Sequence, residues 1–226
     1  MLLHIPALLT PNDITTCRQH LEAASWHDGR HTAGHLAATV KSNLQLPTDH
    51  PVAHTLGDLI LNRLGQNPLY LSAALPLRVL PPRFNKHTEG GHYGSHVDNA
   101  IFVMPGSAVK LRSDVSTTVF LNDPADYEGG ELVIEDTFGE QRIKLAAGDA
   151  IVYPGTSVHR VEPVTQGVRY AAFFWTQSLV KSDEQRRLLF DLDQSIQMLG
   201  RDHPHHPKIA ALSGTYHNLL RMWSET

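Results

Sequence analysis

The chain has 226 residues, enough for one domain with a sizeable core, or one domain with a small appendage. Hydrophobic residues make up 41% and charged residues 19%, and a net charge of -4 without any run of Lys or Arg argues against a nucleic-acid partner. No apolar run approaches the about 20 residues of a membrane span, and the single cysteine excludes an internal disulfide, so we expect a cytoplasmic protein.

The N-terminal residues predict an edge strand followed by a helix. Residues 2–9 form a short apolar run interrupted by proline, which suits an edge strand. Thr10 and Asp13 have the spacing of a capping box, and apolar residues then recur at helical intervals. Cys17 lies on that apolar stripe, so we interpret it as a core residue rather than a nucleophile.

Three further segments precede the centre of the chain. A second helix is predicted for residues 49–64, with Asp49 as its cap and a glycine at its end. Residues 69–80 are rich in apolar residues around a proline, which indicates two short strands or a bent one. The polar segment 27–35 has no pattern that assigns it to a helix or a strand.

The centre of the chain predicts a mainly β fold. Glycine turns at 136–139 and at Gln166-Gly167 indicate two hairpins, each flanked by strand-forming residues. Many short strands at this spacing are typical of a sandwich or barrel, and we expect a jelly roll, the double-stranded β-helix. Strands are predicted at residues 93–104, 116–121, 131–135, 141–145, 150–153, 158–164 and 168–176.

The C-terminal part returns to a helical pattern. Helices are predicted for residues 182–200 and 209–223, and they offer an apolar face for a homodimer. We therefore divide the chain into a domain of residues 1–180, with its catalytic core at about 78–178, and a helical subdomain of residues 181–226. The connecting loop carries three histidines, for which we favour a solvated connector over a metal site. They are His203, His205 and His206.

One pair of side chains has the spacing of a metal site. His96 and Asp98 are two residues apart, so in a strand they project from the same face. Because a His-x-Asp match arises about once by chance in a chain this rich in histidine, the pair needs support from its surroundings. His87 and Glu89 form a weaker rival, followed by two glycines. With His159 as a third ligand, the pair would complete a 2-His-1-carboxylate triad, which holds Fe(II) and leaves coordination positions open.

The candidate third ligand, His159, and a candidate cofactor-binding cation, Arg169, both lie further along the chain than Asp98. His159 lies 61 residues beyond Asp98, and we expect it on a strand that faces Asp98 across the jelly roll. Arg169 follows ten residues later, on the next strand of the same expected hairpin. A guanidinium offers a bidentate fork for a carboxylate, so it could anchor an acidic cofactor beside the metal.

Several stretches carry a resemblance to a known family. They are F-N-K-H-T-E-G-G-H-Y-G-S-H-V-D-N-A, L-R-S-D-V-S-T-T-V-F-L-N, Y-E-G-G-E-L and Y-P-G-T-S-V-H-R-V-E-P-V-T-Q-G-V-R. Together they closely resemble the bacterial PKHD-type hydroxylases, which belong with the prolyl 4-hydroxylase-like Fe(II)/2-oxoglutarate dioxygenases. The resemblance extends to W-H-D-G-R-H-T-A-G near the N-terminus and to the helical tail, so it covers nearly the whole chain. Lys86 departs from it, because arginine is more usual at that position.

The resemblance implies a site and a reaction. It places Fe(II) on His96, Asp98 and His159, and the C5 carboxylate of 2-oxoglutarate on Arg169. Tyr93, three residues before the first ligand histidine, matches a second carboxylate contact. The implied enzyme uses O2 to hydroxylate a substrate while 2-oxoglutarate is converted to succinate and CO2, and L-ascorbate supports it by re-reducing iron. The substrate is open between a peptidyl residue and a small molecule such as a siderophore.

Two other functions remain as alternatives. One is a cupin-like metalloenzyme that uses the triad without 2-oxoglutarate, and Arg169 speaks against it because such a site needs no cation there. The other is a non-catalytic module that binds iron or a ligand, and the intact triad speaks against that. Four polar residues near the site in sequence are assigned no role beyond substrate contact. They are Arg83, Asn85, Asn99 and Arg112.

Overall fold

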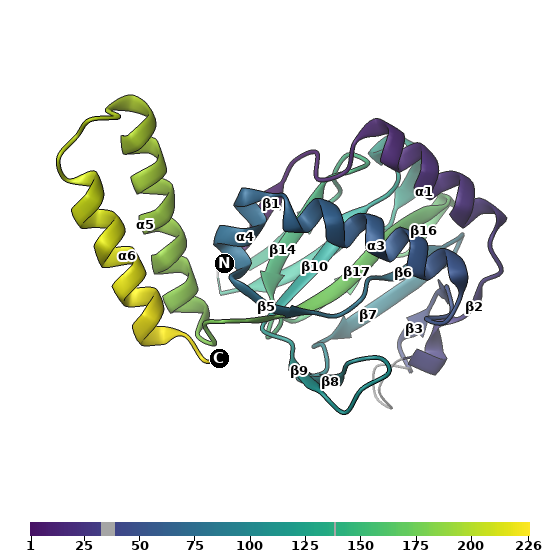
Figure 1. Ribbon diagram of the computed structural model, residues 1–226. Coiled ribbons are helices and arrows are strands. Elements are labelled where there is room, and N and C mark those ends of the chain that lie inside the picture. Colours follow the sequence, from purple (N-terminus) through teal and green to yellow (C-terminus); the bar gives the residue numbers. More distant parts are fainter. Residues whose placement is uncertain (33–38, 138) are drawn as a thin grey trace.

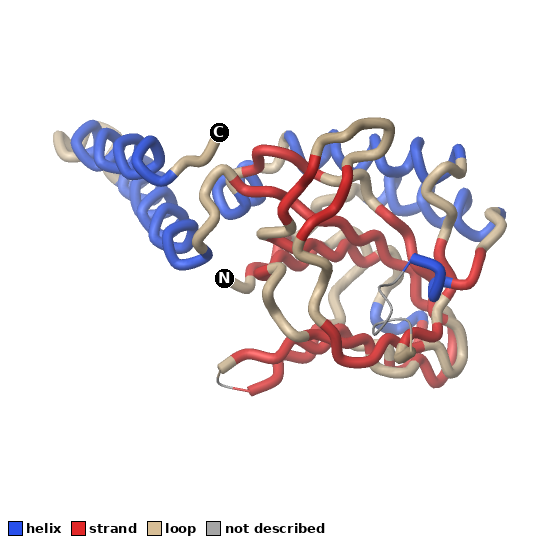
Figure 2. The backbone as a smooth tube through the Cα atoms, turned by 90° about the horizontal axis from the view of Figure 1, so that it is seen from below, coloured by secondary structure: helices blue, strands red, loops and turns tan. Residues whose placement is uncertain are grey.

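Two antiparallel β-sheets face each other in the computed structural model, which describes residues 1–32, 39–137 and 139–226 (Figure 2). The larger sheet contains β1 (Leu3–Ile5), β2 (His27–Asp28), β4 (Leu44–Gln45), β5 (Pro76–Val79), β6 (Arg83–His87), β10 (Val115–Phe120), β14 (Ala150–Pro154) and β17 (Arg169–Ser178). The smaller sheet contains β3 (Lys41–Ser42), β7 (His92–His96), β12 (Leu132–Asp136), β13 (Gly139–Ile143) and β15 (His159–Val161). This arrangement confirms the predicted jelly roll.

The strand order leaves one long central strand in the larger sheet. That order is β1-β14-β10-β17-β6-β4-β2, with β5 pairing beside β6 along the same edge of β17, and the smaller sheet runs β13-β12-β15-β7-β3. Two short ribbons complete the β structure. They are β8 (Ile101–Val103) with β9 (Lys110–Arg112), and β11 (Tyr127–Gly129) with β16 (Val164–Gly167). As predicted, β1 is an edge strand.

Helices cover the outer face of the larger sheet (Figure 1). The helices of this layer are α1 (Pro11–Ala23), α3 (Pro51–Gly65) and α4 (Pro68–Ala74). The predicted capping box is present, since Thr10 and Asp13 exchange hydrogen bonds at the start of α1. The cap of α3 is His50 rather than the predicted Asp49, because the helix begins at Pro51. Cys17 is fully buried in the main core, as expected from its place on the apolar stripe.

Two predictions of β structure need correction. Residues 69–80, predicted as two short strands or a bent one, form the strand β5 only in their second half, and their first half belongs to α4, because Asn67 caps a helical turn and Pro68 occupies its first position. The hairpin predicted around Gln166-Gly167 is also absent, because β16 pairs with β11 while β15 and β17 lie in opposite sheets. Residues 33–35 of the unassigned segment, and Phe138 of the turn predicted at 136–139, lie outside the described residues.

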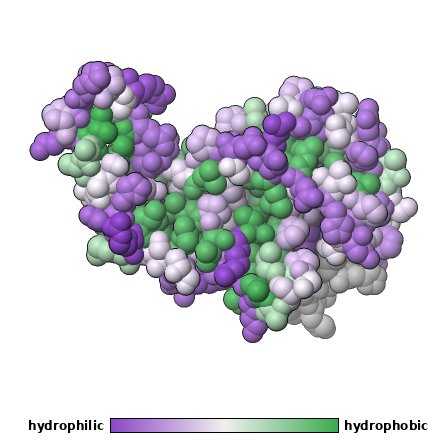
Figure 3. All heavy atoms as spheres, viewed as in Figure 1, coloured by the Kyte–Doolittle hydropathy of each residue, from purple (hydrophilic) through white to green (hydrophobic). Residues whose placement is uncertain are grey.

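The C-terminal helices form a hairpin beside the β body, α5 (Asp183–Asp202) with α6 (Ile209–Trp223) (Figure 1). The hairpin meets the body through α4, and apolar side chains gather between the two in Figure 3. Arg186 fastens this junction, because its buried guanidinium donates to the backbone carbonyls of Val180, Lys181 and Asp114. None of the described helices has the length and apolar character needed to cross a membrane.

The environment of Cys17 predicts slow chemical modification. Burial, helped by the charge of Asp13, raises the pKa of the Cys17 thiol to about 12. The reactive thiolate is therefore scarce at pH 8, and the thiol is out of reach of reagents. N-Ethylmaleimide should label the native protein at least about 100-fold more slowly than the urea-unfolded chain, read as one mass adduct. Equal rates would contradict the packing of α1.

The junction at Arg186 predicts a local loss of stability. Replacing Arg186 by Met leaves buried carbonyl groups without donors and removes one of the two ion pairs of Asp183, the other being with the N-terminal amine of Met1. We expect the free energy of unfolding to fall by about 2–4 kcal/mol, with earlier proteolysis of α5 and α6. Arg187→Met is the matched control, because that side chain is 70% exposed, and it should change little. Equal stability of the two variants would contradict the anchoring role.

Candidate active site

His96 and His159 come together because their strands are hydrogen-bonded neighbours. β7 pairs with β15 so that His159 lies directly opposite His96, and the centroids of the two rings are 4.3 Å apart. Paired residues of an antiparallel ladder project from the same face of the sheet. The expectation that His159 faces Asp98 from the other side of the jelly roll is therefore wrong, because β15 belongs to the same sheet as β7.

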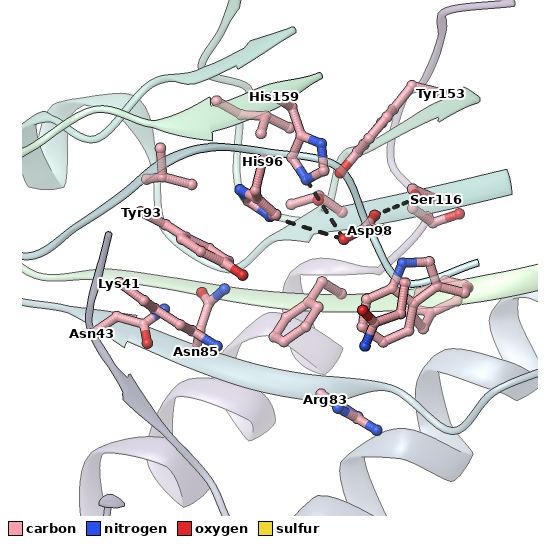
Figure 4. Close-up of a pocket in the computed structure, with 18 of the residues that line it drawn as sticks. Lys41, Asn43, Arg83, Asn85, Tyr93, His96, Asp98, Ser116, Tyr153 and His159 are labelled. Carbon is pink, nitrogen blue, oxygen red and sulfur yellow. Dashed lines mark hydrogen bonds and ion pairs between the residues drawn. The ribbon is translucent and has the colours of Figure 1, made fainter. Parts of the chain in front are cut away.

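Asp98 completes the group from the irregular segment that follows β7 rather than from a strand. β7 ends at His96, so the strand predicted over residues 93–104 is interrupted before β8 begins. The Oδ1 atom of Asp98 lies 3.9 Å from Nε2 of His96 and 3.8 Å from Nε2 of His159 (Figure 4). Ser116 donates to the other carboxylate oxygen at 2.7 Å, which leaves Oδ1 directed at the imidazoles. One potential ligand atom from each residue lies within 4.8 Å of the others.

Both imidazoles are held in a form that suits metal binding. Nδ1 of His96 lies 2.8 Å from the carbonyl oxygen of Gly94, and Nδ1 of His159 lies 3.0 Å from that of Ser157. Since a carbonyl only accepts, each Nδ1 carries the proton and each Nε2 offers a lone pair. Burial, together with the neighbouring His159, lowers the pKa of His96 to about 4, so this ring is neutral at physiological pH. Two neutral imidazoles and one carboxylate on one side of a centre are the donor set that suits Fe(II).

This triad is the group of potential ligands that the described residues bring together. The three histidines of the loop between α5 and α6 are exposed and do not join such a group.

A β-bulge places Tyr93 against the first ligand histidine. Tyr93 and His96 are three residues apart and would lie on opposite faces of a regular strand. Across from them, however, Val161 and His159 are only two apart, so β7 carries one extra residue at this point. The rings of Tyr93 and His96 consequently stack with centroids 3.6 Å apart. Burial raises the pKa of Tyr93 to about 12, which keeps its hydroxyl protonated.

Arg169 faces this group from the other sheet. It opens β17, so it does not share a hairpin with His159 as predicted, yet both side chains line one pocket. The residue is only 1% exposed, and its one hydrogen bond to a described side chain is to Asn85, at 3.4 Å. Its Nε has no acceptor within the described part of the chain, and burial lowers its pKa without any carboxylate to oppose the effect. A buried guanidinium in this state fits an anionic ligand such as the carboxylate of 2-oxoglutarate.

The pocket between the two sheets has about 810 Å³ of empty space, part of it open to solvent. Arg83, Asn85 and Asn99 line it, whereas Arg112 instead forms ion pairs with Asp114 and Glu225. Sequence reasoning missed several lining residues, because strand alternation alone does not say which face is turned inward. They are Lys41, Asn43, Ser116 and Tyr153 (Figure 4).

Comparison with known proteins identifies the family. Residues 82–177 match the 2OG-Fe(II) oxygenase superfamily, and residues 183–225 match the PKHD-type hydroxylase C-terminal domain. A PKHD-type hydroxylase of Delftia acidovorans is 66% identical over the full length of both chains, and the PKHD-type hydroxylase PiuC of Pseudomonas aeruginosa is 57% identical over the same extent. The chain belongs to the PKHD-type hydroxylase family. It is a 2-oxoglutarate-dependent dioxygenase.

Solved structures share the fold of this hydroxylase at low sequence identity. A prolyl-4-hydroxylase of Pseudomonas putida superposes with a TM-score of 0.52 at 19% identity, covering 78% of this chain and 92% of that one. HygX of Streptomyces hygroscopicus, solved with nickel and 2-oxoglutarate, gives 0.53 at 16% identity, covering 80% and 84%. The carbocyclase SnoK of nogalamycin biosynthesis gives 0.56 at 16%, covering 79% and 80%. At these identities the likeness shows the jelly-roll fold alone.

The hydrogen bond from Ser116 predicts a change in metal affinity. In Ser116→Ala the Asp98 carboxylate loses the donor that orients it, and groups of this kind typically contribute about 10- to 100-fold to affinity. We expect Mn(II), titrated as a stand-in for Fe(II) in a calorimeter, to bind weaker by about that factor. Ser95→Ala, on the exposed side of β7, should bind Mn(II) like the unaltered protein. Identical affinities for all three proteins would refute the orienting role of Ser116.

Proposed function

We propose that His96, Asp98 and His159 hold the Fe(II) of this dioxygenase, and that Arg169 binds the C5 carboxylate of its 2-oxoglutarate. The observation that carries the proposal is the meeting of two groups from opposite sheets in one pocket. The smaller sheet supplies a 2-His-1-carboxylate donor set, and the larger sheet supplies a buried guanidinium without a carboxylate partner among the described residues.

The protein residues prepare the site for the reaction. Bound iron would serve to activate O2, the oxidant: one oxygen atom would go into succinate as 2-oxoglutarate loses CO2, and the other into the hydroxyl group of the substrate. The imidazole rings are fixed by Gly94 and Ser157, so the ligand side needs little rearrangement on binding. Ligation from one side leaves the pocket side of the metal to the co-substrate and O2. The buried walls of the pocket exclude water and hold the substrate C–H bond in place.

Tyr93 is proposed as a second contact of the 2-oxoglutarate. Its ring lines the same pocket and its raised pKa leaves the hydroxyl able to donate a hydrogen bond to a carboxylate. Lys41 lies over this ring, with Nζ 4.9 Å from the centroid, a distance at which a cation and an aromatic ring attract each other. Tyr93 would thus serve both as a packing partner of His96 and as a ligand group.

Further features of the enzyme are proposed on less direct grounds. L-Ascorbate would restore ferrous iron after turnover without substrate, as the family resemblance implies. The single buried cysteine is consistent with a reducing, cytoplasmic location. The helical hairpin supports a division into residues 1–180 and 181–226. Its exposed apolar side chains Leu188, Met198 and Met222 support a homodimer through this surface.

Arg169 also decides between the proposed reaction and a cupin-like reaction without 2-oxoglutarate. The latter would leave a guanidinium buried at 1% exposure with no anion to compensate the loss of its hydration. A non-catalytic iron-binding module would not require it either. The 2-oxoglutarate-dependent reaction gives this side chain a partner of the required charge and shape.

Succinate formation from Fe(II), 2-oxoglutarate and ascorbate tests these assignments. Asp98→Ala and His159→Ala should lose activity and Mn(II) binding together. Arg169→Met should keep Mn(II) binding but weaken 2-oxoglutarate binding by about 2–4 kcal/mol, or roughly 30- to 1,000-fold, because the co-substrate carboxylate loses its buried partner. Arg142→Met, on the outer surface of the smaller sheet, is the control. Unchanged 2-oxoglutarate binding in Arg169→Met would overturn the assignment of the cation.

A further inference from the structure

The pocket contains a second arginine that the reaction described above does not use. Arg83 begins β6, two residues before Asn85 and on the same face of the strand, and both line the pocket. In Figure 4 it lies on the side of the pocket away from the two ligand histidines. It is half-buried, and burial lowers its pKa with no carboxylate opposing the effect. No hydrogen bond or ion pair joins it to any side chain in the described part of the chain.

The neighbours of Arg83 are aromatic rather than acidic. Its guanidinium carbon lies 5.4 Å from the ring centroid of Trp175 and 5.7 Å from that of Phe102. These two rings stack on each other at 4.1 Å, and Phe173 meets Trp175 edge-on at 5.6 Å. Aromatic rings attract the positive charge of a guanidinium, but they do not accept the hydrogen bonds that its N–H groups can donate. The rings therefore replace only part of the hydration that Arg83 loses on burial.

The net charge of the pocket also favours an anionic ligand. Its lining contains three cationic side chains, Lys41, Arg83 and Arg169, against the single carboxylate of Asp98. The two positive charges of Fe(II) and the two negative charges of 2-oxoglutarate offset each other, so loading the site leaves this excess in place. Burial, together with the charge of Arg83, lowers the pKa of Lys41 to about 8. An anion is therefore the species that this pocket attracts.

The surface beside Arg83 is apolar. Phe102 and Trp175 present rings to the pocket, and Val97, which also lines it, is 49% exposed. A ligand held by the N–H edge of Arg83 would thus lay its body along aromatic and aliphatic side chains.

We propose that the substrate of this hydroxylase is a small apolar carboxylate, with its carboxylate on Arg83 and its body against Phe102 and Trp175. The proposal rests on the function proposed above for the same pocket. A guanidinium binds a carboxylate through two parallel hydrogen bonds, and this geometry also fixes the position of the attached body. Arg83 is then the residue that selects the substrate by charge, whereas Arg169 selects the co-substrate.

Calorimetric titration with a matched pair of probes tests the proposal. The protein is loaded with Mn(II) and saturating 2-oxoglutarate, and 3-phenylpropionate is compared with 3-phenylpropanamide, which has the same shape without the charge. The carboxylate should bind at least about tenfold more tightly than the amide. Arg83→Met should remove most of that difference while the amide is little affected. Arg78→Met, which removes an exposed arginine from the neighbouring β5, should preserve the difference.

The outcomes separate the inference from the proposed function. If 2-oxoglutarate does not bind or yields no succinate in the unaltered protein, the proposed function itself fails. If 2-oxoglutarate behaves as proposed but the carboxylate binds no better than the amide, the inference about Arg83 is overturned. Displacement of 2-oxoglutarate by 3-phenylpropionate would equally overturn it, because the carboxylate would then occupy the site of Arg169. The comparison of the two probes on the unaltered protein stands even if Arg83→Met does not fold.

Discussion

The backbone hydrogen bonds between β7 and β15 are the constraint on which the rest of the site depends. They place His159 opposite His96, and the ladder geometry then fixes the distance and the common face of the two rings. Asp98 can approach both imidazoles because the chain leaves the strand immediately after His96. A shift of this register by one residue would turn one imidazole to the opposite face of the sheet, and the two histidines would no longer lie together beside Asp98. The smaller sheet is thus the scaffold of the proposed metal site.

The two sheets divide the chemistry between them. The smaller sheet carries the donor set, and the larger sheet carries Arg169 and Arg83, both with lowered pKa values from burial. Cations held in the interior cost solvation energy, and no acidic side chain in the described residues compensates these two. Such an arrangement is destabilising for the protein alone and becomes favourable when anions enter. The stability that the core under α1 and α3 contributes allows the pocket to remain in this state.

Sequence reasoning selected the residues that the structure brings together in one pocket, but not their spatial relation. His96, Asp98, His159 and Arg169 could be selected because few combinations of residue type and spacing satisfy the chemistry of a triad and a cation. The sheet to which each strand belongs depends on long-range pairing, which local turn signals do not report. Gly167 illustrates this, because its φ of +80° serves the ribbon of β16 with β11 rather than a hairpin.

In one segment, a helix-capping signal outweighed an apolar pattern that indicated strands. Residues 69–80 contain apolar residues in strand-like numbers, but the cap at Asn67 starts a helix that buries Tyr70 against the core. The bulge that brings Tyr93 onto His96 could not be foreseen, because an extra residue in one strand is visible only against its partner. By contrast, the buried Cys17 and the capping box of α1 follow from helical spacing, which is a property of the segment itself.

The attachment of the C-terminal hairpin has a consequence for the iron site. The carboxylate of Asp114 accepts hydrogen bonds from Arg112 and from the backbone of Ser178, while its carbonyl accepts from Arg186. Two residues further along the chain, Ser116 of β10 donates a hydrogen bond to the carboxylate of Asp98, the proposed metal ligand. The attachment of the helical hairpin and the orientation of the Asp98 carboxylate therefore depend on the same short backbone segment, residues 114–116.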